Sequence, residues 1–485
     1  IHSRTRLSSH FHGGAPCVSS MSSLHERLSQ LLSRRVFRSL PEHKANSLSA
    51  TTFDEDLPAV YDLQHRVQTD CSQQPHSTKN AFSILKERES SIKKGFCPSR
   101  RSAMLHRKVP NKLENIMRYQ WRANRVFCAK FSQSGETFCC ASPEGVCILD
   151  TRSWDVLRNI NGHHTGWSII DIDYSPDERW IAYSSWSTSI QLVNVFGPHA
   201  LHDPHDLMPG EHTCIFGVRF APNSRHILIG ARSGVAITYD LTAKKILSRQ
   251  PRAHFDDINS VCYLDDSSFL YATGGDDALI KVWDARCISK ACGAFVGHEQ
   301  GITCVETKGD GRYVLSNGKD QCMKLWDMRK LSSIRDAPTS IRRYGDFDYR
   351  YDEWVRDEAP RMSLDHSLMT FVGHGVFRTL IRCNFSPMHS TGQRYVYSGC
   401  ANGHILIYDI LSGKKVQTLQ GRQQIIRDVT WHPHEPVIIG ASWDSSTLRY
   451  VFDPRDDCGR GSKCSRTQRF NQPFASHGVH FESFP

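Results

Sequence analysis

Short runs of alternating apolar and polar residues fill the chain between about residues 124 and 452, and Gly, Ser, Asn and Asp separate them. Runs such as "HILIGA" (226–231) and "HILIYD" (404–409) have the period of two that places every second side chain on one face of a β-strand. Other runs end in an apolar residue before a proline turn, as in "IDYSPD" (172–177) and "VRFAPN" (218–223). This pattern predicts an all-β protein built from many short strands.

The strands recur in units. Two near-identical stretches, "IKVWDARC" (280–287) and "MKLWDMRK" (323–330), end a strand in Trp-Asp. The positions equivalent to this Asp are Asp150, Asn194, Asp240, Asp284, Asp327, Asp409 and Phe452. Successive positions are 43 to 46 residues apart, except for one interval of 82 residues. That interval contains a 39-residue insertion at about 331–370. Units of this length with four strands each are typical of propeller blades. We predict a seven-bladed β-propeller over residues 124–452, with its first and last blades closing on each other.

Two units carry polar residues at positions that a blade buries. These are His254, Thr273, Asp277 and Trp283 in the fourth unit, and His298, Ser316, Asp320 and Trp326 in the fifth. Buried polar groups are tolerated when they hydrogen-bond to one another. Because the same residue types recur at equivalent positions, we interpret them as a structural relay and not as catalytic groups. No Gly-rich phosphate loop or Gly-x-Ser-x-Gly elbow is present, so we expect neither an enzyme nor a cofactor.

Seventeen cysteines raise the possibility of disulfides or a metal site. Several of them lie inside strand-like runs, where a thiol acts as a small hydrophobic group, and no Cys-x-x-Cys pair or zinc-ligand spacing occurs. We therefore expect no metal and a reducing compartment, the nucleus or the cytoplasm. The sequence contains no run of eighteen apolar residues, so it does not predict a membrane-spanning helix. Since the chain begins at Ile1, we expect Met21 to be the natural start.

The net charge of +10 is carried by residues 1–123, where 20 Lys and Arg face 10 Asp and Glu. The repeat region is formally neutral, so we do not expect it to bind nucleic acid directly. Residues 1–80 read as a mostly disordered arm with one short amphipathic helix, in which Leu24, Leu28, Leu31 and Leu32 share a face. Residues 81–123 are expected to supply an outer closing strand, and residues 453–485 a disordered tail.

The repeats resemble the WD-repeat propellers, and more narrowly the substrate receptors of cullin-4 RING ubiquitin ligases. The stretches that carry this resemblance are "GWSIIDIDYSPD" (166–177), "YSSWS" (183–187), "FLYATGGDDALIKVWDAR" (269–286), "TLIRCNFSPMHSTGQRYVYSGCANG" (379–403) and "IRDVTWHPHEP" (426–436). The chain departs from the family in lacking an acidic N-terminal run, in its degraded first and seventh blades, and in Arg422, where a histidine is usual.

The resemblance implies a docking surface for the ligase adaptor, the large subunit of the damaged-DNA-binding protein. Its marks are two Trp-Asp-x-Arg boxes in neighbouring blades, formed by Trp283, Asp284, Arg286, Trp326, Asp327 and Arg329. An arginine two residues after the strand leaves on the face that carries the connections between the third and fourth strands. Each arginine has two possible partners, the adaptor or the carboxylate of its own blade. "LDTR" (149–152) is a partial third box, and the helix with Leu28, Leu31 and Leu32 either grips the adaptor or caps the propeller.

The opposite face is expected to bind a substrate protein. Its loops and strand ends offer aromatic, basic and amide residues, which are common anchors of peptide-binding surfaces: Trp167, Trp186, Arg232, Lys319, Arg382, Asn402, Arg427 and Trp443. Several exposed cations among them would favour an acidic degron. The resemblance suggests a cap-n-collar stress-response transcription factor as a substrate.

The insertion, which contains "RRYGDFDYRYDEW" (342–354), is expected to form a flap on the adaptor face. The alternative function is a scaffold in chromatin or RNA processing, which would not associate with cullin-4.

Overall fold

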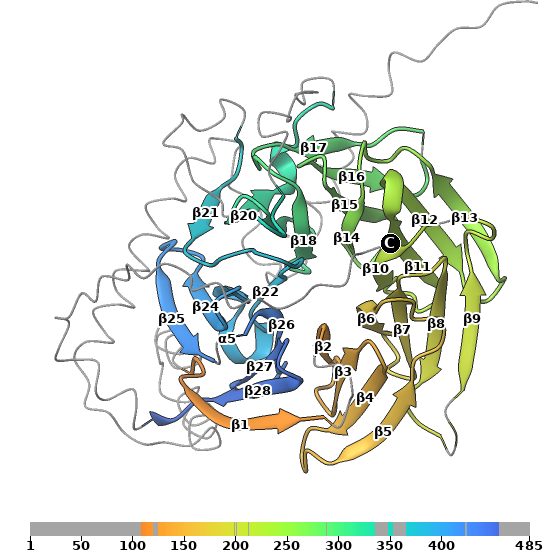
Figure 1. The fold of residues 1–485 in the computed structure, drawn as a ribbon. Helices are drawn as coiled ribbons and strands as arrows, with labels where there is room; N and C mark the ends of the chain where they lie inside the picture. Colours follow the sequence, from red (N-terminus) through yellow and green to blue (C-terminus); the bar gives the residue numbers. More distant parts are fainter. Residues whose placement is uncertain are drawn as a thin grey trace, which may run out of the picture.

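The computed structural model describes residues 108–119, 125–197, 199, 201–211, 213–287, 289–334, 348–352, 365–421 and 424–454. These residues form seven four-stranded antiparallel sheets arranged around a central axis, which confirms the predicted seven-bladed propeller (Figure 1). Within each blade the strands are named a to d from the axis outward. None of the helices in this part of the chain is long and apolar enough to cross a membrane.

The blades follow one another along the chain. Blade 1 contains β2 (Cys128–Phe131), β3 (Thr137–Ser142), β4 (Gly145–Asp150) and β5 (Val156–Asn161). Blade 2 contains β6 (Ile169–Tyr174), β7 (Trp180–Ser185), β8 (Ser189–Asn194) and β9 (His202–Asp206). Blade 3 contains β10 (Ile215–Phe220), β11 (His226–Ala231), η3 (Arg232–Gly234), β12 (Val235–Asp240) and β13 (Lys245–Gln250).

Blade 4 contains β14 (Ile258–Tyr263), β15 (Leu270–Gly275), β16 (Ile280–Asp284) and β17 (Gly293–Phe295). Blade 5 contains β18 (Ile302–Thr307), β19 (Tyr313–Gly318), β20 (Cys322–Asp327), η4 (Met328–Lys330) and β21 (Met369–Val372). Blade 6 contains β22 (Cys383–Phe385), α5 (Met388–Thr391), β23 (Tyr395–Ser398), β24 (His404–Asp409) and β25 (Lys415–Gln420).

Blade 7 joins the two ends of the repeat region. It contains β26 (Ile426–Trp431), β27 (Val437–Ser442) and β28 (Ser446–Val451), and its outer strand is β1 (Lys112–Arg118) from the N-terminal side. Lys112 lies opposite Val451 and Arg118 opposite Ser446 in this antiparallel pair. The strand expected from residues 81–123 is therefore β1, and it covers the edge that β28 would otherwise expose.

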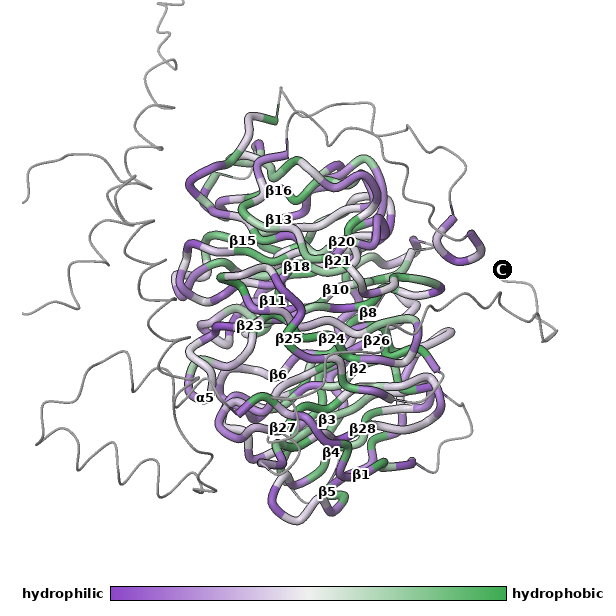
Figure 2. Tube along the Cα trace, turned by 90° about the vertical axis from the view of Figure 1, so that its left-hand side faces the viewer, coloured by the Kyte–Doolittle hydropathy of each residue, from purple (hydrophilic) through white to green (hydrophobic). Residues whose placement is uncertain are grey.

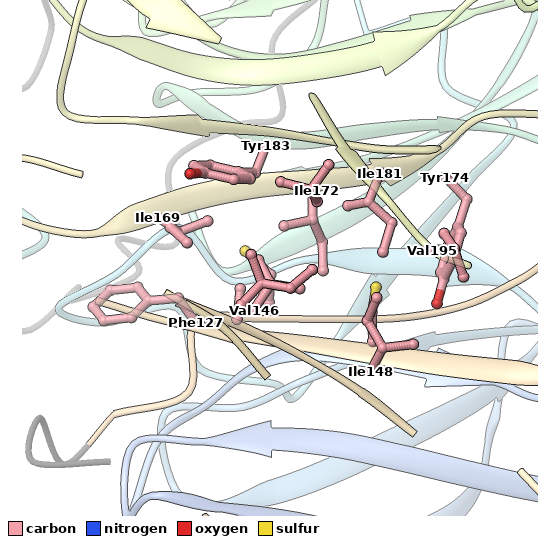
Figure 3. Packing of buried hydrophobic residues seen from close by; sticks show 14 residues of the cluster. Phe127, Val146, Ile148, Ile169, Ile172, Tyr174, Ile181, Tyr183 and Val195 are labelled. Carbon is pink, nitrogen blue, oxygen red and sulfur yellow. The ribbon is translucent and has the colours of Figure 1, made fainter. Parts of the chain in front are cut away.

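The hydrophobic core lies between neighbouring blades. Seven clusters of buried side chains occupy the seven junctions between the described blades. Figure 3 shows the junction of blades 1 and 2, where Val146 and Ile148 of β4 pack against Ile172 of β6 and Ile181 of β7. Because each blade buries both faces against its neighbours, the ring closes only when all seven are present.

The strand c aspartate recurs because it holds the turn that follows. Asp240, Asp284, Asp327 and Asp409 each accept a hydrogen bond from the backbone N–H two residues later, at 2.9 to 3.0 Å. Such aspartate turns fix the direction of the chain as it leaves the strand. The propeller thus has two faces, seen at opposite edges of the disc in Figure 2. We call them the c–d face, formed by the a–b and c–d connections, and the d–a face, formed by the d–a and b–c connections.

Candidate functional site

The polar side chains of blade 4 form a chain of hydrogen bonds inside the blade. Nδ1 of His254 lies 2.7 Å from Oδ1 of Asp277, and its Nε2 lies 2.7 Å from Oγ1 of Thr273. Nε1–H of Trp283 donates to the same Thr273 oxygen at 2.9 Å. Burial would raise the pKa of Asp277, but the hydrogen bond and charge of His254, together with the charge of Lys281, lower it. The four residues named for this relay are brought together.

Blade 5 repeats the arrangement with serine in place of threonine. Nδ1 of His298 lies 3.0 Å from Oδ2 of Asp320, and its Nε2 lies 2.7 Å from Oγ of Ser316. Nε1–H of Trp326 donates to Ser316 at 2.8 Å. All four residues are buried. A substrate in solvent cannot reach these histidines, so the geometry gives them a structural role.

Arg286 and Arg329 lie on the c–d face, each beside its own strand c aspartate. Nε of Arg286 donates to Oδ1 of Asp284 at 2.9 Å and Nη2 donates to Oδ2 at 2.6 Å. Nε of Arg329 donates to Oδ1 of Asp327 at 3.1 Å and Nη2 donates to Oδ2 at 2.7 Å. The hydrogen bonds from Arg286 lower the pKa of Asp284. Two partners were considered for each arginine, the adaptor and the carboxylate of its own blade. The structure shows that each arginine is hydrogen-bonded to the carboxylate of its own blade.

These contacts orient the guanidinium groups without burying them. The arginine side chains are 57% and 43% exposed, whereas the paired carboxylates are almost fully buried. Within the part of the chain that is described, Nη1 of neither arginine has a hydrogen-bond partner. Each fork thus holds a planar cation whose outer edge is free for a second acceptor.

The other members of the two boxes are not surface residues. Trp283 and Trp326 are buried between blades, and Asp284 and Asp327 are buried beneath the arginines. We expected all six box residues to contact an adaptor. The structure corrects this expectation, because only Arg286 and Arg329 of the six are exposed, and Asp284 and Asp327 hold their guanidinium groups in place.

The partial third box differs in its side-chain geometry. The backbone N–H of Arg152 donates to Asp150 at 2.7 Å, as in the other turns. Its guanidinium reaches Glu136 instead, at 3.1 Å, and remains 81% exposed. Blade 1 therefore lacks the fork seen in blades 4 and 5. The predicted helix with Leu28, Leu31 and Leu32 lies outside the described residues.

The d–a face carries a continuous row of aromatic rings. Phe127 lies 5.6 Å from Trp443 and 5.3 Å from Trp167, measured between ring centroids. Trp167 lies 6.1 Å from Trp186, which lies 5.9 Å from Phe216. Trp167 and Trp186 are 44% and 42% exposed, Trp443 and Phe216 are partly exposed, and Phe127 is buried beneath them. We call these five residues the aromatic row. Sequence reasoning identified the three tryptophans and missed the two phenylalanines, because their positions, Phe127 just before β2 and Phe216 within β10, gave no sign of this contact.

Three of the basic residues expected to bind a substrate are largely buried and paired with other groups of the propeller. Arg382 forms an ion pair with Asp171 at 2.6 Å, and Arg427 donates to the backbone oxygens of Phe127 and Ile170 at 2.7 and 3.0 Å. Lys319 forms an ion pair with Asp276 at 2.8 Å. Strand a lines the axis, where a cation out of water must be paired. Of the remaining residues in that prediction, Arg232 and Asn402 are exposed.

Arg382 belongs to a buried ionic network around the axis that the sequence did not indicate. Asp171 accepts from Arg219 at 2.6 Å as well as from Arg382, and Arg219 also pairs with Glu306 at 3.0 Å. Burial would raise the pKa of Asp171, but the charges of the two arginines outweigh it and lower the pKa to about 2. The network borders a cavity of about 230 Å³ that is lined by the ends of several a strands.

The insertion of blade 5 is not confined to the c–d face. It leaves β20 on that face, but the backbone N–H of Arg378, in the connection from β21 to β22, donates to the carbonyl oxygen of Tyr349 at 3.0 Å. The ammonium group of Lys319, in the b–c connection of blade 5, lies 4.2 Å from the centroid of the Tyr349 ring. Residues 348–352 therefore lie on the d–a face, and the predicted flap on the opposite face is wrong for them.

Comparison with known proteins supports the interpretation of the repeats. The model of the WD domain, G-beta repeat, matches residues 154–194, 245–284, 289–327 and 413–448. The chain is 37% identical over 349 residues to the LEC14B homolog of Prunus armeniaca, an alignment that covers 68% of this chain and 73% of that protein. It is 32% identical over 427 residues to the DDB1- and CUL4-associated factor 11 homolog of Caenorhabditis elegans, covering 83% and 74%. The homolog of the same name in Caenorhabditis briggsae is 31% identical, covering 81% and 74%. These relatives confirm the resemblance of the sequence to WD-repeat protein 23, a cullin-4-associated substrate receptor factor.

Proposed function

Because the chain belongs to the WD-repeat family that includes the LEC14B proteins and the DDB1- and CUL4-associated factor 11 homologs, we propose that it is a substrate receptor of a cullin-4 RING ubiquitin ligase. In this proposal one face of the propeller docks on the DDB1 adaptor and the other face holds a protein for ubiquitination and degradation. The chain itself is non-catalytic, and its contribution is to hold substrate lysines near the ligase-bound ubiquitin conjugate. It acts in the nucleus and the cytoplasm.

The observation that carries the docking proposal is the pair of aspartate-held arginines in blades 4 and 5. Each guanidinium is fixed by two hydrogen bonds to a buried carboxylate and keeps its outer edge exposed. An arginine that is already oriented loses little side-chain entropy on binding, which favours its use as an interface anchor. Two such anchors in adjacent blades suit the carbonyl and carboxylate groups of an adaptor loop.

The aromatic row supports the assignment of substrate binding to the d–a face. Trp167 and Trp186 expose a large apolar area on a rigid scaffold. Tryptophans are common among the residues that contribute most of the binding free energy in protein interfaces. The two faces lie on opposite sides of the disc, so one propeller can hold both partners at once. A cap-n-collar stress-response transcription factor is the candidate substrate that the sequence resemblance suggests.

The docking proposal is tested by affinity purification of the full chain from cells. We expect the Arg286→Ala, Arg329→Ala double variant to recover at least tenfold less adaptor than the unchanged chain, because an arginine anchor typically contributes about 2 kcal/mol or more to an interface. Both substitutions remove exposed side chains, so the propeller itself should remain folded.

A matched control is available in blade 3. Arg225 lies on the same face, is 56% exposed and forms an ion pair with the strand c carboxylate of Asp240 at 2.7 Å, but it precedes β11 and is not part of a Trp-Asp-x-Arg box. Arg225→Ala should leave adaptor recovery unchanged. Full recovery with the double variant, or an equal loss with Arg225→Ala, would contradict docking through the two boxes.

A further inference from the structure

The insertion of blade 5 is attached to the propeller at both ends. On the outgoing side, Ser332 exchanges two backbone hydrogen bonds with Ala294 of β17, at 2.9 and 3.0 Å. On the returning side, Asp365 forms a largely buried ion pair with Lys324 of β20 at 2.6 Å. The segment between these points therefore begins and ends at blades 4 and 5.

Residues 348–352 lie between these attachments and rest on the d–a face. Tyr349 presents its ring to the ammonium group of Lys319 at 4.2 Å, and its carbonyl oxygen accepts from the backbone of Arg378 at 3.0 Å. Its neighbour Tyr351 is 67% exposed, and Arg350 is held in a fork by Asp348 at 2.9 and 2.6 Å. Tyr349 therefore contacts the face through one aromatic ring and one backbone hydrogen bond. Short peptides bind protein surfaces through contacts of the same kinds.

The ammonium group beneath Tyr349 is also held by contacts that do not involve that ring. With Tyr349 in place Lys319 is only 13% exposed, and its ammonium group is fixed by Asp276, which also accepts from Nδ2 of Asn259 at 2.6 Å. A fixed, largely desolvated ammonium group interacts strongly with an aromatic face. We call Lys319, Asp276 and Arg378 the tyrosine socket.

The charge around the socket indicates what else it can bind. Arg378 is exposed, and among the described residues it has no acidic partner. Tyr349, which fills the socket, belongs to the sequence "DFDYRYDEW" (346–354), in which four acidic residues accompany the aromatic ones. Tyr349 shows that this part of the face accepts an aromatic ring, and the exposed Arg378 favours acidic residues beside that ring.

We propose that the tyrosine socket is a binding site for an aromatic residue within an acidic segment of a partner protein, and that Tyr349 fills it in the free chain. This inference rests on the proposed function in taking the d–a face as the substrate face. A tethered segment acts at an effective concentration in the millimolar range, so Tyr349 competes with any partner of the same chemistry. Displacement of Tyr349 opens the socket.

The test uses a fluorescently labelled peptide of residues 346–354 as the probe and the full chain as the receptor, with binding followed by fluorescence anisotropy. Tyr349→Ala, which empties the socket, should bind the probe at least tenfold more tightly than the unchanged chain. Tyr349→Phe should bind it as weakly as the unchanged chain, because the phenyl ring keeps the contact with Lys319. Adding Lys319→Met to Tyr349→Ala should weaken binding at least tenfold.

Tyr351→Ala is the matched control, since it removes an exposed tyrosine two positions away and should behave like the unchanged chain. Equal probe binding by the unchanged chain and by Tyr349→Ala would overturn the inference. So would tight binding that does not depend on Lys319, because the probe would then bind elsewhere.

The outcome is separable from that of the docking proposal. Adaptor recovery by the Lys319→Met chain should equal that of the unchanged chain, because Lys319 lies on the face away from Arg286 and Arg329. This measurement also shows that the variant is folded. If the probe fails to bind while adaptor recovery still depends on Arg286 and Arg329, the socket proposal is contradicted and the docking proposal is not.

Discussion

An arginine beside the strand c aspartate is not in itself distinctive in this propeller. Asp240 and Asp409 pair with Arg225 and Arg394, which precede strand b of blades 3 and 6, at 2.7 and 2.9 Å. Arg286 and Arg329 reach equivalent carboxylates from the turn that follows strand c. Arg312, which precedes strand b of blade 5, also lies 3.3 Å from Asp327, so the buried strand c carboxylate has a cation beside it in blades 3 to 6. Blades 4 and 5 differ from the others because their Asp-x-Arg spacing places an arginine of the c–d connection beside the strand c carboxylate.

Ser316 is the residue on which the blade 5 relay depends most. Its hydroxyl is fully buried and serves both His298 and Trp326. Ser316→Ala leaves two buried nitrogen atoms without a partner, which should lower the free energy of unfolding by about 2 kcal/mol or more. Urea denaturation measures this loss. Thr273→Ser in blade 4 keeps the corresponding hydroxyl and should cost less; equal losses would contradict the relay.

Asp171 should make stability sensitive to acid. Its pKa in the folded protein, about 2, is below the ordinary value of 3.8. The carboxylate therefore contributes stability, about 2 kcal/mol, that is present above pH 4 and lost as the pH falls towards 2. Asp171→Asn should be less stable than the unchanged chain at pH 7, and the difference should shrink as the pH falls from 5 to 2. Urea denaturation across this range measures it, and a difference independent of pH would contradict the ion pairs with Arg219 and Arg382.

At the scale of elements, the closure of the ring depends on one short strand. β1 pairs with β28 from Lys112 to Arg118, and Nδ2 of Asn111 donates to the carbonyl oxygen of Asp453 at 2.8 Å. This pairing joins residues more than 300 positions apart. The edge of β28 is thereby protected from pairing with another chain.

The register of this pair is testable by crosslinking. Lys112 and Val451 are direct partners, so cysteines at both positions should form a disulfide on mild oxidation, identified by mass spectrometry. The crosslink closes a very long loop and should raise the unfolding free energy by up to roughly 5 kcal/mol, seen as a higher Tm. Cysteines at Arg118 and Val451, at opposite ends of the pair, provide the control. Efficient crosslinking of the control and none of the first pair would contradict the register.

The repeats could be predicted from the sequence, and the course of the insertion could not. Blade strands have a period of two, and the third strand of each unit ends at a regularly spaced position that is usually an aspartate, so the number and order of the blades follow from spacing alone. Residues 348–352 have no such period, and their position depends on contacts with Lys319 and Arg378, which are distant in the chain and in other connections. Long connections of this kind take their position from tertiary contacts.

The same limit explains why the burial of some candidate binding residues was not predicted. A tryptophan in a b–c or d–a connection is near the surface by position, and Trp167 and Trp186 are indeed exposed. Arg427 lies within strand a, and Arg382 directly precedes one; sequence does not indicate whether such a side chain turns outward or toward the axis. The partners that hold Arg382 inward, above all Asp171 in blade 2, are apparent only once the ring is closed.

At the scale of the whole molecule, the proposal assigns one task to each face of a rigid disc. The exposed forks of Arg286 and Arg329 lie on the c–d face, and the aromatic row and the tyrosine socket lie on the d–a face. The insertion starts beside Arg329 at η4 and reaches the opposite face at Tyr349. Substitutions on one face should therefore leave binding at the other unchanged.

The most direct test of the docking claim is the dissociation constant of the purified full-length chain for the purified adaptor, measured by biolayer interferometry. We expect Arg286→Ala and Arg329→Ala each to weaken binding at least tenfold, since each loses about 1.4 kcal/mol or more, and Arg225→Ala to have no effect. Unchanged affinity of the Arg286→Ala, Arg329→Ala double variant would contradict the docking claim.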